Sequence, residues 1–449
     1  MRTIASQLIP RLRLPVILSS LWIACLVFPS NVATSGEKKT ANSGPRVTLE
    51  VYGTVTTHEG QRLRLLTDLG NVVIRTQNSG KLDYHVHLEA DSSQKNAKEL
   101  LKSFSVNARE GSEGVYFRGQ TFGRQLRGRL WVTVEINVPK NYGLDVWTGG
   151  GNIETEDVNG RVALSTLGGN ITSGNVGGGA RLVTDGGHIT VKNVGGELSA
   201  NTGGGHITTG TVGGSASLHT NGGHIRAASV KGVARLDTGG GNITLEQSGG
   251  ELVAETVGGQ IEVGEAAGLV RAKTGGGGIR VVRVSGPTNL ETGGGSIYLT
   301  QVDGLVKAST GAGGITAWFV SSPKRPGTCD LQSGDGDIVV YLPRQLSVTI
   351  DAQIQQGNEH RVIADPAFPL KVSYDEASNG SRRIRAEGAL NGGGEVLRLR
   401  TVAGNIRLIL SDSSKQVEIY KQHMEQIQQK LATQLRMMER SLPGSDDRP

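Results

Sequence analysis

An 18-residue repeat in the middle of the chain constrains its fold more than any other feature. A threonine recurs every 18 residues without a slip, and the third and fifth residues after it are always Gly and Ile. The repeated threonines are Thr148, Thr166, Thr184, Thr202, Thr220, Thr238, Thr256, Thr274, Thr292 and Thr310, and the repeated isoleucines are Ile153, Ile171, Ile189, Ile207, Ile225, Ile243, Ile261, Ile279, Ile297 and Ile315. A short fixed period of this kind indicates a fold of stacked structural repeats.

Within each repeat, apolar and polar residues alternate. Small or apolar side chains stand at every second position after the isoleucine, as in Ile261 and Val263, and again after a second glycine, as in Val162 and Leu164. Alternation of period two indicates strands with one buried face. Each repeat therefore predicts two short strands and two tight turns, with glycines expected to supply positive φ angles at the corners. The predicted fold class is all-β, a single-stranded β-solenoid (β-helix) of 18-residue coils.

The same alternation predicts that the repeat threonines point inward. Their hydroxyls are then expected to bond to one another or to the glycine corner. An outward, ligand-binding threonine array is the alternative, and the parity argues against it. Small and β-branched residues must fill this core, because the chain has only six Phe and four Met beside 67 Gly.

The flanks of the repeat differ from it in pattern. Irregular β-structure with a short helix near Ala97 to Phe104 is predicted before the repeat, and a loop containing Lys324 and Arg325 follows it. The last segment is polar, with apolar residues three or four apart, which is typical of an amphipathic helix. That helix can form a coiled coil between copies of the chain or lie on the solenoid. The expected divisions are 45–147 (N-terminal cap), 148–320 (coils), 321–412 (C-terminal β region and cap), 413–442 (α-helix) and 443–449 (disordered tail).

Residues 1–35 have the pattern of a secretory signal peptide. Three arginines precede an apolar stretch from Leu14 to Phe28, and small residues follow this stretch. An uncleaved anchor is the alternative, and the residues around Cys25 make a poor lipoprotein signal. Removal of this segment lowers the net charge from +6 to +3, so nucleic acid is not an expected partner. Only Cys329 would remain, which rules out an intrachain disulfide.

The repeat offers few groups for metal or catalytic chemistry. A calcium roll needs recurrent Asp, but the residue before each isoleucine is mostly Asn, His, Gln or Gly. His188, His206 and His224 occupy this position in three consecutive coils and are the candidate metal ligands, for which a polar ladder interchangeable with Asn is the simpler interpretation. Asp330, Asp335 and Asp337 form the one carboxylate cluster, and Asp-Gly pairs are typical of turns. No catalytic residue and no cofactor is predicted.

Three segments resemble a known family. They are Ile136 to Ile153 (INVPKNYGLDVWTGGGNI) with the Gly-Gly-x-Ile units after it, Asp337 to Pro343 (DIVVYLP), and Thr401 to Ile406 (TVAGNI). Together they resemble the bacterial adhesin-labelled family of unknown function DUF4097, over about residues 45–412. The resemblance implies a β-helical shape and a place at the cell surface or in the periplasm, and it brings no catalytic residues.

The expected function is that of an exported, non-enzymatic, adhesin-like solenoid of the bacterial envelope. It would present an extended surface to protein or glycan partners in the periplasm, on the cell surface or outside the cell. The alternative is a periplasmic structural or regulatory scaffold that binds a protein through residues 413–442. A polysaccharide-acting β-helix enzyme is a further alternative, and a homo-oligomer through the same helix is an open expectation.

Overall fold

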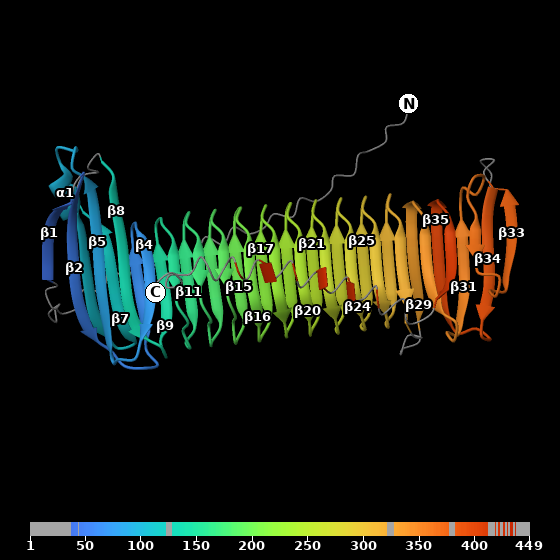
Figure 1. The fold of residues 1–449 in the computed structure, drawn as a ribbon, viewed down its shortest axis with the longest axis horizontal. Helices are drawn as coiled ribbons and strands as arrows, with labels where there is room; N and C mark the ends of the chain where they lie inside the picture. The colour runs from blue at the N-terminus through green and yellow to red at the C-terminus, as the bar shows by residue number, and fades with distance from the viewer. Residues whose placement is uncertain are drawn as a thin grey trace, which may run out of the picture. The chain divides into compact units, whose positions relative to one another are not determined.

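The computed structural model describes residues 37–43, 45–122, 128–320, 327–376 and 382–411, with scattered residues between 418 and 436. Over these ranges the fold is all-β with two long sheets of parallel strands, as the alternation predicted (Figure 1). The predicted signal segment 1–35, the loop with Lys324 and Arg325, and most of the predicted helix 413–442 lie outside the described residues.

The repeat region contributes one short strand per coil to each sheet. In sheet A, Ile153 pairs with Ile171, and Ile171 pairs with Ile189, so paired residues are 18 positions apart. Sheet B has the same register, with Thr166 opposite Thr184. The strands of sheet A are β10 (Ile153–Thr155), β12 (Ile171–Ser173), β14 (Ile189–Val191), β16 (Ile207–Val212), β18 (Ile225–Val230), β20 (Ile243–Ser248), β22 (Ile261–Ala266), β24 (Ile279–Val284), β26 (Ile297–Val302) and β28 (Ile315–Phe319). Those of sheet B are β9 (Gly143–Thr148), β11 (Val162–Thr166), β13 (Ala180–Thr184), β15 (Leu198–Thr202), β17 (Ala216–Thr220), β19 (Ala234–Thr238), β21 (Leu252–Thr256), β23 (Val270–Thr274), β25 (Thr288–Thr292) and β27 (Val306–Thr310).

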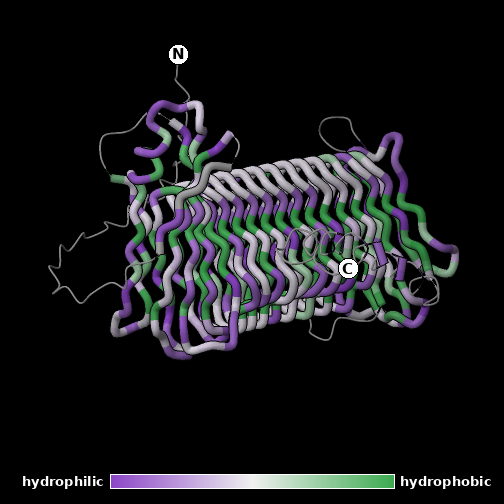
Figure 2. Tube along the Cα trace, turned by 60° about the vertical axis from the view of Figure 1, so that its left-hand side comes forward, coloured by the Kyte–Doolittle hydropathy of each residue, from purple (hydrophilic) through white to green (hydrophobic). Residues whose placement is uncertain are grey.

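The core is a narrow column between the two sheets. The repeat isoleucines are at most 1% exposed, and the inward residues of sheet B, such as Leu218, are buried as well. A third inward column consists of valines in the turn between the strands, where Val158, Val176 and Val194 are joined by single β-bridges. Residues of like hydropathy therefore form continuous stripes across successive coils (Figure 2). Each coil is covered by its neighbours, so stability depends on stacking.

The repeat threonines connect each coil to the one before it. All ten are buried. The hydroxyl of Thr220 donates to the carbonyl oxygen of Gly205 in the preceding coil at 2.8 Å, and it accepts from the amide of Gly223 at 3.1 Å. The same donation to a glycine 15 residues earlier recurs from Thr166 to Thr310. The hydroxyls thus bond to the glycine corner.

The corner glycines are required for a reason other than the predicted one. Among the glycines three residues after each repeat threonine, only Gly151 has a φ in the left-handed range, at 118°. The others are required by close approach. A methyl group on Gly223 would lie 1.9 Å from the carbonyl oxygen of Gly205. At the preceding residue of the corner, a Cβ on the glycine would meet no atom closer than 3.7 Å, which explains why Ala312 can replace glycine there.

The N-terminal end of the stack is made of strands that do not follow chain order. β3 and β4 pair with β9 and β10, while β7 and β8 pair with β3 and β4 on their other side. β2 and β5 extend sheet A with antiparallel pairing. The helix near Ala97 is confirmed. The elements are β1 (Glu37–Ser43), β2 (Arg46–Thr56), β3 (Arg62–Thr67), β4 (Asn71–Gln77), β5 (Lys81–Asp91), α1 (Ala97–Ser103), β6 (Phe104–Gly111), β7 (Gly114–Thr121) and β8 (Leu130–Pro139).

The C-terminal end shows a similar rearrangement. β35 and β36 lie between the β29–β30 coil and strands β31 and β32, so the last two described strands of the chain form an internal layer of the C-terminal β region. Antiparallel β34 and β33 end sheet B. The elements are β29 (Thr328–Asp335), β30 (Ile338–Pro343), β31 (Val348–Ile354), β32 (Val362–Ala364), β33 (Leu370–Glu376), β34 (Arg382–Leu390), β35 (Glu395–Ala403) and β36 (Ile406–Ser411).

Candidate functional site

The outer face of sheet B carries columns of side chains in register. Because strands pair residue for residue, side chains of one column follow each other at about 4.8 Å. One column alternates basic, small polar and aliphatic residues. Its members are Arg181, Ser199, Ser217, Arg235, Val253, Arg271, Asn289 and Lys307.

Charges on this face are only partly compensated. Arg271 forms an ion pair with Glu251, and in the neighbouring column Lys273 lies 3.4 Å from Glu291. Within the described part of the chain, Arg181 and Arg235 form no ion pair. Sheet B therefore presents spaced cations on a flat polar face, which can contact an extended partner at many points but encloses nothing.

The three candidate histidines directly precede strands β14, β16 and β18 of sheet A, at the residue before the isoleucine. Their rings stack, with centroids 4.9 Å apart between His188 and His206 and 4.8 Å between His206 and His224. The Nδ1 atom of His188 accepts a hydrogen bond from the amide of His206 at 2.9 Å, and the same contact joins His206 to His224 and His224 to Asn242. Each imidazole thus caps the next coil.

Asparagine performs the same task in neighbouring coils. Asn170 Oδ1 accepts from the amide of His188 at 2.8 Å, and Asn242 Oδ1 accepts from the amide of Gln260 at 2.9 Å. Histidine Nδ1 and asparagine Oδ1 are at the same distance along the side chain, so they are interchangeable as acceptors. This geometry accounts for the mixed His and Asn pattern.

The stacked rings are poorly placed to chelate a metal. Two Zn–N bonds of about 2.0–2.1 Å bring two nitrogens within about 4.2 Å, whereas parallel rings hold equivalent atoms near the 4.8 Å ring spacing. Burial lowers the pKa of His206, and the nearby His224, His188 and Arg226 lower it further. Burial and Arg226 lower the pKa of His224 in the same way. A lowered pKa favours the neutral ring, and only a neutral imidazole can accept a hydrogen bond at Nδ1.

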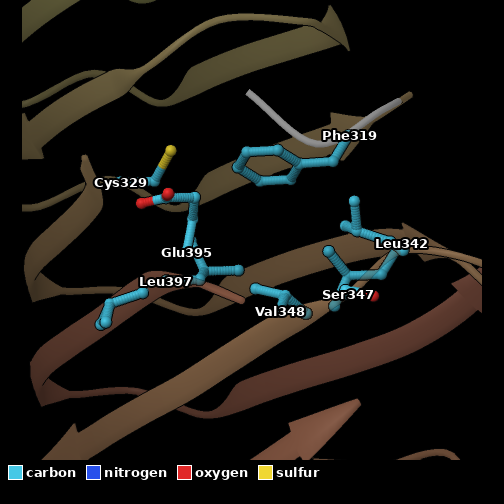
Figure 3. A pocket seen from close by; sticks show the side chains of 9 residues that line it. Phe319, Cys329, Leu342, Ser347, Val348, Glu395 and Leu397 are labelled. Atoms are coloured by element: carbon cyan, nitrogen blue, oxygen red, sulfur yellow. The ribbon is translucent and has the colours of Figure 1, made fainter. Parts of the chain in front are cut away.

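A pocket near the C-terminal end is too small for a substrate. Phe319, Leu342, Val348 and Leu397 line it together with Cys329 and Glu395 (Figure 3). Its volume is about 20 Å³, enough for about one water molecule. Cys329 is 3% exposed, and burial raises the pKa of its thiol, which makes it an unreactive core residue.

The aspartates that suggested a catalytic cluster have structural partners. Asp337 accepts from the amide of Asn405 at 2.7 Å and lies 3.5 Å from Arg407. Asp330 accepts from Gln332 at 3.0 Å. Asp337 thus connects the segment before β30 to β36, whereas the contact between Asp330 and Gln332 lies within β29. Asp330 also lies 3.9 Å from Arg400 of β35.

The repeat analysis missed one polar cluster, which lies in the N-terminal cap. Glu50, His85 and His87 bring their side-chain donor atoms within 4.8 Å of one another on the outer face of sheet A. The signal that could have found them is the His-x-His spacing in the alternating segment from Lys81 to Asp91, because residues two apart on a strand share a face.

Fold and surface together define an all-β protein of stacked parallel coils with polar outer columns. Residues 61–409 match the Toastrack DUF4097 family, and the chain belongs to that family. This confirms the resemblance noted from the Ile136 to Ile153 segment. None of the curated proteins matches the sequence. In the part of the chain that the structure describes, we find no helix with the length and apolarity needed to span a membrane.

Several solved structures resemble the chain weakly. A candidate cell adhesion protein from Clostridium sporogenes is 9% identical, with 80% of this chain and 99% of that one covered and a TM-score of 0.14. A candidate adhesin from Bacteroides fragilis is 14% identical over 56% and 96% of the two chains, with a TM-score of 0.27. A candidate lipid-binding protein from Parabacteroides distasonis is 8% identical over 80% and 96%, with a TM-score of 0.15.

Proposed function

We propose that this chain is an exported, non-enzymatic β-solenoid of the bacterial envelope that binds macromolecules through its outer faces, in the manner of an adhesin. The observation that supports the proposal is the register of the coils, which repeats equivalent outward positions along sheet B. Many weak contacts to one polymeric partner then act together, because each contact raises the effective concentration of the next.

The proposal includes the division of the chain expected from its sequence. Residues 1–35 would direct export, 45–147 and 321–412 would cap the stack, and 18-residue coils over 148–320 would supply the binding surface. Residues 413–442 would form a helix outside that surface, followed by a disordered tail. The partner would be a protein or glycan of the envelope or of a surface that the cell meets.

The uncompensated cations offer a direct test of the binding face. A variant with Arg181→Ser, Arg235→Ser and Lys307→Ser keeps the strand pattern and removes three positive charges from one column. We expect it to lose binding to immobilised acidic glycans or matrix protein, with wild-type affinity falling as salt concentration rises. The matched control is Ser199→Thr and Ser217→Thr in the same column, which adds methyl groups and changes no charge.

Location distinguishes this function from the scaffold alternative. Protease added to intact cells is expected to degrade a surface-exposed adhesin. A protein that survives this treatment, and that co-purifies with an envelope protein only when residues 413–449 are present, would instead act as a periplasmic scaffold.

A further inference from the structure

The cap cluster sits on a sheet of known register. β5 runs between β2 and β8 and is antiparallel to both, with Glu50 opposite His87 and Glu135 opposite His85. His85 and His87 are two residues apart, so both point to the outer face, while Val86 between them is fully buried. Regular strands therefore hold the cluster in position.

Both imidazoles converge on one carboxylate. Glu50 Oε2 lies 2.5 Å from His85 Nε2, and Glu50 Oε1 contacts His87 Nδ1. The side chains of Glu50, His85 and His87 are 22%, 32% and 31% exposed, so ions in solution can reach them. Two imidazoles and a carboxylate are a common set of three protein ligands for a divalent transition metal.

The opposite nitrogen of each histidine faces a second carboxylate. His87 Nε2 lies 2.8 Å from Glu89 Oε1, and His85 Nδ1 lies 3.5 Å from Glu135 Oε2. Metal-binding histidines almost always have such an outer partner, which orients the ring and strengthens the ligand. Arg46 in turn hydrogen-bonds Glu89.

An aromatic ring restrains the first imidazole. Tyr52 stacks on His85 with a centroid separation of 4.4 Å and an angle of 4°. The plane of the ring, and hence the direction of its nitrogen lone pair, is held by this contact. The histidine ladder on the coils lacks both converging nitrogens and outer carboxylates, although its three rings are also solvent-accessible.

We propose that Glu50, His85 and His87 bind one divalent transition metal ion of the Zn²⁺ type, leaving a fourth coordination position open to solvent. Zn–N and Zn–O bonds of about 2.0–2.2 Å place tetrahedral ligand atoms about 3.3 Å apart. The present 2.5 Å contact between Glu50 and His85 must therefore widen by less than 1 Å, and a ligand pair at the 4.8 Å limit of the cluster must close by about 1.5 Å. The nitrogen-rich set favours Zn²⁺, Co²⁺, Ni²⁺ or Cu²⁺ over Ca²⁺ or Mg²⁺.

The metal would replace protons that now lie between the ligands. Burial by itself lowers the pKa of His87, but its hydrogen bonds to Glu89 and Glu50 outweigh burial and raise that pKa. On binding, the ion occupies the space between Glu50 and the ring nitrogens that face it, so the metal competes with protons for these nitrogens. The metal then joins β2 to β5.

Metal titration of the full chain, expressed without a polyhistidine tag and stripped with EDTA, tests the proposal. Zn²⁺ followed by calorimetry and Co²⁺ followed by visible absorption are expected to show one equivalent bound. His85→Ala or His87→Ala should abolish the signal, and Glu89→Gln should weaken affinity by about 10–100-fold. The matched control replaces His188, His206 and His224 together by Asn, which removes three histidines, keeps the acceptors, and should leave binding unchanged.

Two results would overturn the assignment. One is the absence of stoichiometric binding by the wild-type chain, and the other is equal binding by wild type and the His87→Ala variant. Far-UV circular dichroism without metal checks that each variant is folded. If the alanine variants unfold, Glu50→Gln decides the question, because it preserves side-chain volume and removes only the central anionic ligand.

Discussion

Replacing a single corner glycine by alanine should break the contact between two coils. In the middle of the stack, the Cβ of Gly223→Ala would lie 1.9 Å from the carbonyl oxygen of Gly205 and 2.4 Å from its carbon. The adjacent Gly222 has its nearest neighbour at 4.0 Å, the carbonyl oxygen of Gly204. Gly222→Ala is therefore a control that adds the same methyl group one residue away.

The size of the effect follows from the displacement required. Cβ atoms in folded proteins stay beyond about 3.0 Å from such an oxygen, so the two coils must separate locally by about 1.1 Å. That movement stretches the hydrogen bond from the Thr220 hydroxyl to the Gly205 carbonyl oxygen, at present 2.8 Å long, which crosses between the two coils. Overpacking costs about 1–3 kcal/mol, and each weakened hydrogen bond about 0.5–1.5 kcal/mol. A loss of about 3 kcal/mol is expected for Gly223→Ala.

Urea unfolding followed by far-UV circular dichroism measures the difference. Gly222→Ala should change the unfolding free energy by no more than about 1 kcal/mol, and it can increase stability by restricting the unfolded chain. Hydrogen exchange of the amides around the substituted corner should show whether the loss is local, as expected for a stack with nearest-neighbour coupling. The reasoning fails if both variants unfold at the same urea concentration.

Three further predictions concern the ladders and the C-terminal segment. In the folded chain the pKa values of His206 and His224 lie below the ordinary value, so the unfolded chain protonates at a higher pH than the folded chain. The unfolding free energy should therefore fall as the pH drops below about 6.5. The double variant His206→Asn with His224→Asn should show a weaker dependence of the unfolding free energy on pH in urea titrations. Thr220→Val removes a buried hydroxyl that both donates and accepts and should cost about 1–3 kcal/mol, whereas Thr208→Val on the outer face of sheet A should change stability by less than about 0.5 kcal/mol. Deleting residues 413–449 should convert an oligomer to a monomer by light scattering, and a chain that is monomeric before and after deletion contradicts self-association through this segment.

Much of the central fold was predictable because the pattern of one coil is repeated ten times. The inward parity of Ile261 and Val263 placed both on the buried face, where each is fully buried. The valine column at Val158 and Val176 was missed because these residues lie in a turn, where alternation does not apply. The candidate histidines were found on the predicted column, and their role as caps required the positions of backbone amides in the next coil.

The ends of the stack could not be predicted in the same way. Nothing local in the sequence of β3 shows that it pairs with both β7 and β9, since such pairings depend on where a distant segment returns. The cluster of Glu50 with His85 and His87 has the same origin, because one residue comes from β2 and two from β5. A His-x-His spacing alone predicts that the two rings lie on the same face of a strand. It does not identify the carboxylate on the neighbouring strand opposite them.

By itself, the sequence determined the period of the coil, the face of each strand that turns inward, and the family to which the chain belongs. These properties repeat within a few residues, so local sterics and hydrophobic burial are enough to specify them. Only the tertiary structure decided why Gly223 must be glycine, how His206 bonds, and which segments close the stack. Those properties depend on distances between residues in different coils, and such distances exist only after the coils have stacked.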